Sequence, residues 1–203
     1  MKCFPTILVF LCVAFLSSCH KDAPTPSNSF SKNTFPVSVG NWWRYRHVDM
    51  LSNTIDTIIL KVVSVDTPKF SDTYKCYVYE FSQIVDSAIL IVSDSLISYS
   101  SANTDYSYFG DFALKLPFSQ SSHWLNGSYF DSTRVISYTS SRMVLGKPYN
   151  VFFLKRVATS PGFSEVQTLS IAKDIGIVET SVDIFNGYPV QQQDLQLIDY
   201  QLK

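Results

Sequence analysis

From residue 35 to the end, the chain alternates between short runs rich in Thr, Val, Ile, Tyr and Phe and breaks rich in Ser, Asn, Asp, Gly and Pro. β-branched and aromatic residues favour strands, and turn-forming residues at this spacing are typical of antiparallel sheets. The expected strands cover residues 42–48, 55–65, 74–83, 88–92, 96–99, 129–138, 142–145, 151–157, 165–172, 175–182 and 195–202. The last of these also has helical spacing, but we favour a strand. The sequence therefore predicts an all-β fold, with an antiparallel, strongly curved sheet that forms an open barrel or a sandwich.

The segment 55–65 is apolar on both faces of the expected strand, because successive side chains point to opposite sides. One face carries Ile58, Leu60 and Val62, and the other carries Ile55, Ile59 and Val63. A single sheet with one wet face would not favour this pattern. Either a second layer covers the other face, or the sheet curls and that face lines a cavity.

The N-terminus carries an export signal. Lys2 precedes an apolar run from Phe4 to Leu16, which is too short to span a membrane but has the length of a secretory signal. The run ends in Leu16-Ser17-Ser18-Cys19, which resembles the lipobox of bacterial lipoproteins. The resemblance implies that Cys19 receives a lipid and becomes the mature N-terminus, so the membrane is an expected partner through this lipid.

Three regions follow from this interpretation: a signal peptide at 1–18, a lipidated N-terminus with a flexible tether at 19–34, and a single β domain at 35–203. The tether is rich in Pro, Ser and Asn and would span about 20 Å. We expect a lipid-anchored envelope protein at the outer membrane, on its periplasmic or its surface face. His20-Lys21-Asp22 resembles the surface-export signals of Bacteroidetes lipoproteins, and an ordinary solvated tether is the alternative.

The net charge and the absence of known motifs argue against several classes of function. The formal net charge is −1, which does not favour a nucleic-acid partner. Cys76 is the one cysteine after Cys19, so no disulfide is expected within the mature chain, and burial is its expected state. Catalytic motifs and metal-ligand spacings are absent, so we expect no cofactor and no metal. His47 and Asp49 share a face of one strand and could orient an imidazole, but a half-exposed structural histidine is favoured.

Aromatic residues are densest in one region of the chain. Its members are Tyr99, Tyr106, Tyr108, Phe109 and Phe112. They could form the wall of a ligand site, but the packed core of a β domain is the favoured interpretation. Trp43 and Trp124 each follow an apolar-Pro pair at the same spacing, and we expect both to be buried at equivalent strand starts.

Four positions resemble the O-glycosylation pattern of Bacteroidetes, in which Asp precedes a Ser or Thr and a small or aliphatic residue follows. These positions are Thr57, Ser87, Ser95 and Ser132. Ser95 is the best candidate, because it lies in a predicted hairpin turn where a transferase has access.

Three segments resemble a group of Bacteroidetes lipoproteins that has no assigned activity. Residues 35–42 resemble the group's FPLxxGNxW opening, residues 116–118 with Trp124 its second Pro/Trp segment, and residues 172–179 its KGVGIV segment. The chain departs from the group at 120–122, where a Gly-containing turn is usual. The strand pattern of the group is similar to that of half-barrel lipoprotein carriers, which is an analogy of fold.

Three functions are compatible with the sequence. The leading hypothesis is a non-enzymatic, lipid-anchored envelope protein that binds or scaffolds a partner through its β domain. The alternatives are a carrier of an apolar ligand in a half-barrel cavity and a hydrolase built on loops. A large cavity would favour the carrier, and a cleft with converging carboxylates or His47 would favour the hydrolase.

Overall fold

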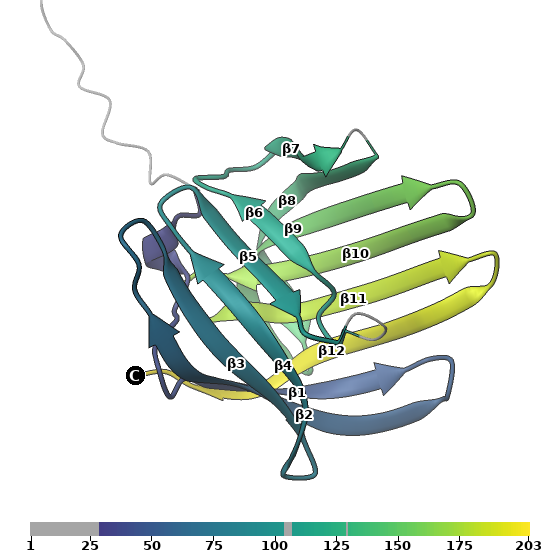
Figure 1. The fold of residues 1–203 in the computed structure, drawn as a ribbon, viewed down its shortest axis with the longest axis horizontal. Coiled ribbons are helices and arrows are strands. Elements are labelled where there is room, and N and C mark those ends of the chain that lie inside the picture. Colours follow the sequence, from purple (N-terminus) through teal and green to yellow (C-terminus); the bar gives the residue numbers. More distant parts are fainter. Residues whose placement is uncertain (1–28, 104–106, 129) are drawn as a thin grey trace, which may run out of the picture.

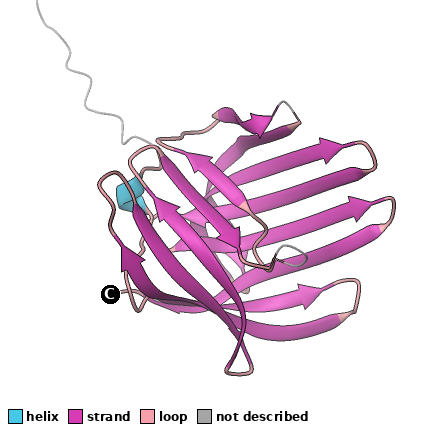
Figure 2. Cartoon of the chain, in the orientation of Figure 1, coloured by secondary structure: helices cyan, strands magenta, loops and turns pink. Residues whose placement is uncertain are grey.

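In the computed structural model, which describes residues 29–103, 107–128 and 130–203, twelve strands form one antiparallel sheet. Strands and a single short 3-10 helix, η1 (Lys32–Thr34), account for the regular structure of the described chain (Figure 2). The strands are β1 (Trp42–Asp49), β2 (Thr54–Asp66), β3 (Asp72–Glu80), β4 (Gln83–Val92), β5 (Leu96–Ser101), β6 (Phe112–Lys115), β7 (His123–Ser128), β8 (Asp131–Val144), β9 (Lys147–Ser160), β10 (Phe163–Ala172), β11 (Gly176–Asn186) and β12 (Pro189–Gln201).

The order of the strands makes the sheet almost a ring. Each strand pairs with the next along the chain, except that β6 and β7 form its two edges, and β1 pairs with β12 at its centre. Strands β3–β6 cross in front of β8–β12, so the sheet curls and its two halves face each other (Figure 1). The predicted all-β, strongly curved antiparallel fold is confirmed, in its nearly closed, barrel-like form.

Strand β2 makes the bend between the two halves. Its first part pairs with β1, from Thr54 to Lys61, and its second part pairs with β3, from Ile58 to Asp66. Ile58, Leu60 and Val62 point into the core and are buried, whereas the opposite face of the strand is turned outward. One apolar face of β2 therefore packs in the core, and the other forms part of an apolar outer surface.

The two tryptophans lie where the sequence places them. Trp43 is 4% exposed near the start of β1, and Trp124 is 8% exposed near the start of β7. Each indole N–H donates to a backbone oxygen, that of Ile175 for Trp43 (2.6 Å) and that of Ala113 for Trp124 (3.0 Å). The bond from Trp124 crosses from β7 to β6 and so bridges the two edges of the sheet.

Trp43, the residue that follows the 35–42 segment, contacts the 172–179 segment. Gly176 lies beneath the indole, and a Cβ built at Gly176 would lie 3.5 Å from the Trp43 nitrogen. Gly176 also has a φ of +100°, which favours glycine. Glycine at this position therefore serves both the backbone conformation and the packing against Trp43.

The packed domain begins before the expected boundary at residue 35. Phe30 is fully buried, pairs through its backbone with Phe118, and stacks on its ring with a centroid distance of 4.9 Å. Residues 30–34 therefore belong to the fold rather than to the tether.

Several strand boundaries differ from those expected. The segment 74–83 is broken by a tight turn at Phe81-Ser82, and the two expected strands at 129–138 and 142–145 are parts of β8. No range was predicted for strands β6 and β7, because they are short and carry weak alternation, although a strand start was expected at Trp124. Within the described residues, no helix is long and apolar enough to cross a membrane.

Candidate functional site

The predicted aromatic cluster fills the interior. Tyr99, Phe109 and Phe112 are buried, Tyr108 is half-buried, and Tyr106 lies outside the described residues. The ring of Phe109 contacts Tyr45 and Tyr99 at centroid distances of 5.1 and 5.5 Å. The enclosed space beside these rings measures about 20 Å³, which is room for about one water molecule. The geometry favours the core interpretation over a ligand wall.

Residues 107–111 form a loop whose backbone carbonyls accept hydrogen bonds from side chains of the sheet, and we call it the anchored loop. Gln191 donates to the oxygen of Ser107, and Gln193 donates to the oxygens of Ser107 and Tyr108. In the same way, Gln167 donates to the oxygen of Phe109 and Arg156 to that of Asp111. This loop carries Phe109 into the core, so its position fixes part of the interior.

His47 is 3% exposed, which corrects the expectation of a half-exposed residue. Its Nδ1 lies 2.8 Å from Asp56, not Asp49, and its Nε2 lies 3.2 Å from Oε1 of Gln193. Asp49 instead accepts hydrogen bonds from the backbone of Leu51 and Ser52. Desolvation raises the pKa of Asp49, but the bonds at this turn outweigh it and lower the pKa. His47 is therefore a structural residue that orients the amide holding the anchored loop.

Arg156 joins two carboxylates beside the same loop. It binds Asp131 through two nitrogens, at 3.0 and 2.9 Å, and Glu165 at 2.7 Å. Burial raises the pKa of Glu165, and the guanidinium of Arg156 offsets this only in part. Held by Arg156, Glu165 is poorly placed to donate or take a proton from a substrate.

A wide concavity lies on the outer face of β1, β2 and β3, at the bend of the sheet, and we call it the outer groove. It encloses about 460 Å³ and is lined by Trp42, Arg44, Thr57, Ile59, Lys61, Tyr79, Phe81 and Ser82. These residues alternate along the strands with buried ones, so they point away from the core. The groove therefore presents three aromatic side chains and two cations outside the domain.

The turn that closes one end of the outer groove is conformationally strained. Phe81 and Ser82 have φ values of 47° and 70°, both in the left-handed region, and they connect Glu80 to Gln83 in a two-residue hairpin. Such turns favour Asn-Gly, because side chains at positive φ cost free energy. Phe81 is nevertheless 82% exposed, so its ring is not there to pack in the core. Strain of this kind clusters at functional sites.

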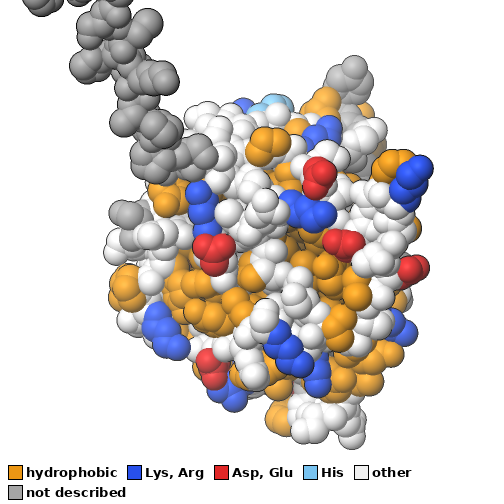
Figure 3. Space-filling view, turned by 90° about the vertical axis from the view of Figure 1, so that its left-hand side faces the viewer, with side chains coloured by type: hydrophobic (Ala, Val, Ile, Leu, Met, Phe, Trp, Pro, Cys, Tyr) orange, Lys and Arg blue, Asp and Glu red, His pale blue; other side chains and the backbone are white. Residues whose placement is uncertain are grey.

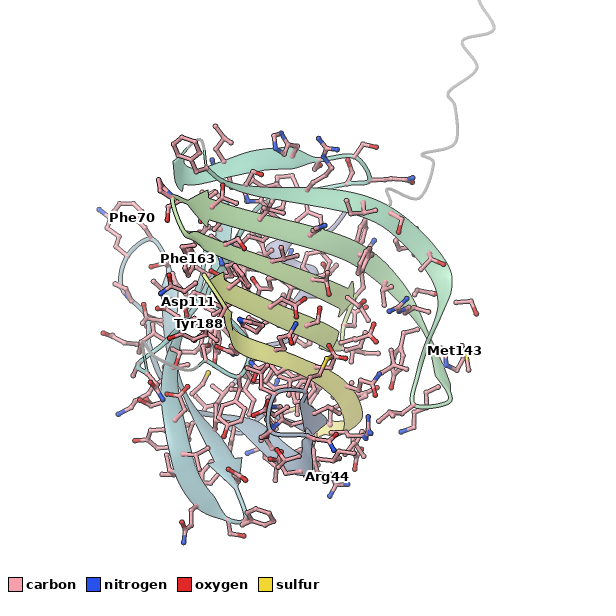
Figure 4. All side chains as sticks on the ribbon, turned by 90° about the vertical axis from the view of Figure 1, so that its right-hand side faces the viewer. Arg44, Phe70, Asp111, Met143, Phe163 and Tyr188 are labelled. Atoms are coloured by element: carbon pink, nitrogen blue, oxygen red, sulfur yellow. The ribbon has the colours of Figure 1, made fainter. Side chains whose placement is uncertain are left out.

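The cations of the outer groove are not fully neutralised. Arg44 reaches Asp199 through one terminal nitrogen at 3.3 Å, whereas its Nε is buried without a hydrogen-bond partner. Lys61 has no carboxylate within ion-pair distance among the described residues. Figure 4 shows Arg44 at the outer side of the sheet. Figure 3 shows hydrophobic patches with charges between them on the face that forms the left-hand side of Figure 1.

A second concavity lies between the anchored loop and the ends of β10, β11 and β12, and we call it the loop cleft. It encloses about 290 Å³. Its polar lining is Asn103, Ser107, Asp111, Glu165, Asn186 and Gln191, and its apolar lining is Phe163, Ile184 and Val190 with Gly110. Two carboxylates thus share a cleft, but both are bound by donors, Glu165 by Arg156 and Asp111 by the backbone of Ser101.

The predicted modification sites differ in accessibility. Ser95 is exposed in the turn between β4 and β5, as expected, and Thr57 is exposed in the outer groove. Ser87 and Ser132 lie partly buried in β4 and β8. Cys19, the predicted lipidation site, lies outside the described residues. Among the described residues, no group of three or more His, Cys, Asp or Glu is placed to hold a metal ion.

Sequence reasoning identified neither concavity, although it singled out Thr57 of the outer groove as a modification candidate. Trp42, Arg44 and Lys61 alternate with core positions, so the outward aromatic and basic residues of β1 and β2 were a usable signal for the outer groove. The loop cleft offered none, because its lining combines residues 103–111 with residues of the 163–191 region, which lie far apart along the chain.

Comparisons with known proteins show the fold but no activity. No protein-family model matches the sequence, and no curated protein matches it. A candidate lipoprotein from Parabacteroides distasonis has a similar structure, with a TM-score of 0.51 and 12% identity over 83% of this chain and 98% of that one. A candidate exported protein with a YmcC-like fold, from Bacteroides fragilis, gives a TM-score of 0.47 and 11% identity over the same shares.

Proposed function

We propose that this chain is a lipid-anchored protein of the bacterial envelope that binds an acidic glycan in the outer groove, without catalysing a reaction there. The Leu16–Cys19 segment and the tether after it support the anchor, and outer-membrane attachment is part of the proposal. The segments at 35–42 and 172–179 support assignment to the Bacteroidetes lipoprotein group. The Parabacteroides distasonis protein that shares the fold is itself a candidate lipoprotein, which agrees with this proposal.

The observation that carries the binding proposal is the composition of the outer groove. Trp42, Tyr79 and Phe81 offer aromatic faces, on which the C–H face of a sugar ring packs. Arg44 and Lys61 offer charged donors, and a carboxylate is the acceptor that a guanidinium matches best. A glycan that carries uronic acids combines an apolar ring face with a carboxylate, so it complements both features.

The same lining argues for binding rather than catalysis. The described side chains of the outer groove include no carboxylate, histidine or thiol. These are the groups that most often serve as general acid, general base or nucleophile near neutral pH. The filled interior likewise gives no specific support to the carrier hypothesis.

The anchor is tested by replacing Cys19 with Ser. Without the thiol, no lipid is attached, and the mature domain should move from the membrane fraction to the soluble envelope fraction. A Cys76→Ser variant serves as the matched control and should remain with the membranes. If the Cys19→Ser variant partitions with membranes as the parent does, the anchoring part of the proposal is wrong.

Glycan binding is tested by calorimetric titration of the mature Cys19→Ser chain with oligogalacturonate and, for comparison, with cello-oligosaccharide of equal length. We expect saturable binding of the acidic oligomer that weakens as salt is added, because the charged contacts are screened. Trp42→Ala and Lys61→Ala should each weaken binding, and Lys155→Ala on β9 should not. Equal affinity for the neutral oligomer, or no effect of either groove variant, would contradict the proposal.

A further inference from the structure

The loop cleft has the composition of a binding site rather than of a packing defect. Six polar residues and three apolar ones converge on about 290 Å³, near the lower end of the roughly 300–1,000 Å³ range of small-molecule sites. Figure 4 shows Asp111 and Phe163 on the same side of the molecule, and both line this cleft. The space suits one small ring rather than an extended chain.

Two buried acceptors in the cleft have no partner. Gln191 is 3% exposed, and its amide nitrogen donates to the oxygen of Ser107 at 2.8 Å. That bond fixes the orientation of the amide and leaves its Oε1, which lies buried, without a hydrogen-bond partner. The hydroxyl oxygen of Ser107 is buried and without a partner in the same way. Because buried polar groups are almost always paired, a small shift of these two side chains toward the cleft would let both atoms accept from a donor on a bound ligand.

The charged groups around the cleft make it rich in acceptors. The carboxylate of Asp111 accepts from the backbone of Ser101 at 2.9 Å and from Ser100 at 3.3 Å, which leaves lone pairs available. Glu165 pairs with Arg156, which also pairs with Asp131, so one cation serves two carboxylates. A ligand that fits must bring several hydrogen-bond donors, and a neutral ligand with several hydroxyls meets this requirement.

The apolar lining and the loop backbone define the remaining shape. Phe163, Ile184 and Val190 offer an apolar wall opposite the polar groups. Gly110 has a φ of +63°, and a Cβ there would lie 2.9 Å from the Gln167 amide, so glycine lets the anchored loop lie close against β10. A ring with hydroxyl donors on its edge and C–H groups on its face matches this arrangement.

We propose that the loop cleft binds one neutral sugar unit, with its hydroxyls donating to Gln191, Ser107 and Asp111 and its ring face against Phe163. This site goes beyond the proposed function, because it lies on other strands than the outer groove and its ligand is uncharged. Either site can fail its test while the other passes.

The test uses the mature Cys19→Ser chain and five sugars: glucose, galactose, mannose, fucose and N-acetylglucosamine. Saturation-transfer NMR detects binding, and the side-chain amide resonance of Gln191 reports where it occurs. We expect at least one sugar to bind saturably and to shift this resonance. Spermidine is included as a cationic donor, and its saturable binding in the absence of any sugar binding would overturn the proposal.

Variants decide whether the cleft is responsible. Phe163→Ala and Asp111→Asn should each weaken sugar binding by about tenfold, since each removes one contact of the ring or its hydroxyls. Both changes leave intact the hydrogen bonds that side chains of the sheet donate to the backbone carbonyls of the anchored loop. Gln191→Leu serves as a third variant, and it removes both the Oε1 acceptor and the hydrogen bond that Gln191 donates to Ser107. Phe70→Ala, in the exposed turn between β2 and β3 and outside both concavities, is the matched control and should leave sugar binding unchanged. Failure of all five sugars to bind, or parent-like binding by both first variants, overturns the proposal.

Discussion

At the residue scale, the turn at Phe81-Ser82 departs most from what the sequence indicates. Hairpins of this type are predicted from Asn-Gly or Asp-Gly, and Phe-Ser carries no such signal. For that reason the segment 74–83 reads as one uninterrupted strand. The local preference is overridden because β3 and β4 pair over their whole length, which leaves Phe81 and Ser82 as the connection.

Relieving this strain should stabilise the protein. Replacing Phe81 with Asn together with Ser82→Gly provides residues that accept positive φ, and we expect a gain of about 1–2 kcal/mol in the free energy of unfolding, measured in urea. The same double variant should bind oligogalacturonate more weakly, because an aromatic face of the outer groove is lost. A variant that is no more stable than the parent would show that the turn is not strained.

The thiol of Cys76 should be inert in the folded protein. Burial raises its pKa to about 12, whereas an unfolded cysteine ionises near pH 8.5. The folded state therefore holds the proton more tightly, so the stability that this group contributes is complete below about pH 8.5 and falls as the pH rises towards 12.

Two measurements check this expectation on the mature Cys19→Ser chain, where Cys76 is the single thiol. An aromatic disulfide reagent should react with it only after urea unfolds the protein. A Cys76→Ala variant should lose stability less steeply above pH 8.5 than its parent. Rapid reaction of the native thiol would mean that it is not buried as described.

At the scale of elements, the tryptophans show what the sequence can predict and why. Their positions after a proline and at a strand start are local features, so burial of Trp43 and Trp124 was predicted and is confirmed. The anchored loop shows the opposite case. Its contacts come from Gln167, Gln191 and Gln193, glutamines that lie far along the chain and would normally be read as solvent-exposed.

Truncation of Trp43 should be severe. The Trp43→Ala change leaves a cavity between β1 and the β10–β11 turn and removes the bond to Ile175, and we expect a loss of about 3–5 kcal/mol. The neighbouring Trp42→Ala change, on the outer face, should cost far less. Urea midpoints of the two variants measure the difference, and equal midpoints would contradict the assigned faces of β1.

At the scale of the whole molecule, the fold class follows from the sequence but the ring of strands does not. Alternation and turn residues are local signals, and they predict strands and their curvature. Pairing of β1 with β12 joins residues such as Trp42 and Gln201, and no local pattern encodes that choice. Strands β1–β6 and β7–β12 form two groups of six, and each group begins with the strand that carries one tryptophan of the repeated Pro–Trp spacing.

Because the interior is filled with side chains, we predict that the domain does not bind an apolar ligand inside the sheet. Enclosed space of about 20 Å³ leaves no room for an acyl chain. The mature Cys19→Ser chain should therefore show no saturable binding of fatty acids of several lengths, measured with a fluorescent apolar dye as competitor. Stoichiometric binding of about one fatty acid per chain would restore the carrier hypothesis.

The pairing of β1 with β12 has a consequence for how such a chain is made and delivered. The first strand to leave a ribosome or a translocation channel must wait for the last, since its partner on one side is the C-terminal strand. Until β12 arrives, β1 and β11 each present an unpaired backbone edge, which invites aggregation. Sheets closed by such distant contacts fold slowly. We therefore expect the exported chain to depend on a holding chaperone during transit, and a chain that ends before residue 189 to accumulate in aggregates.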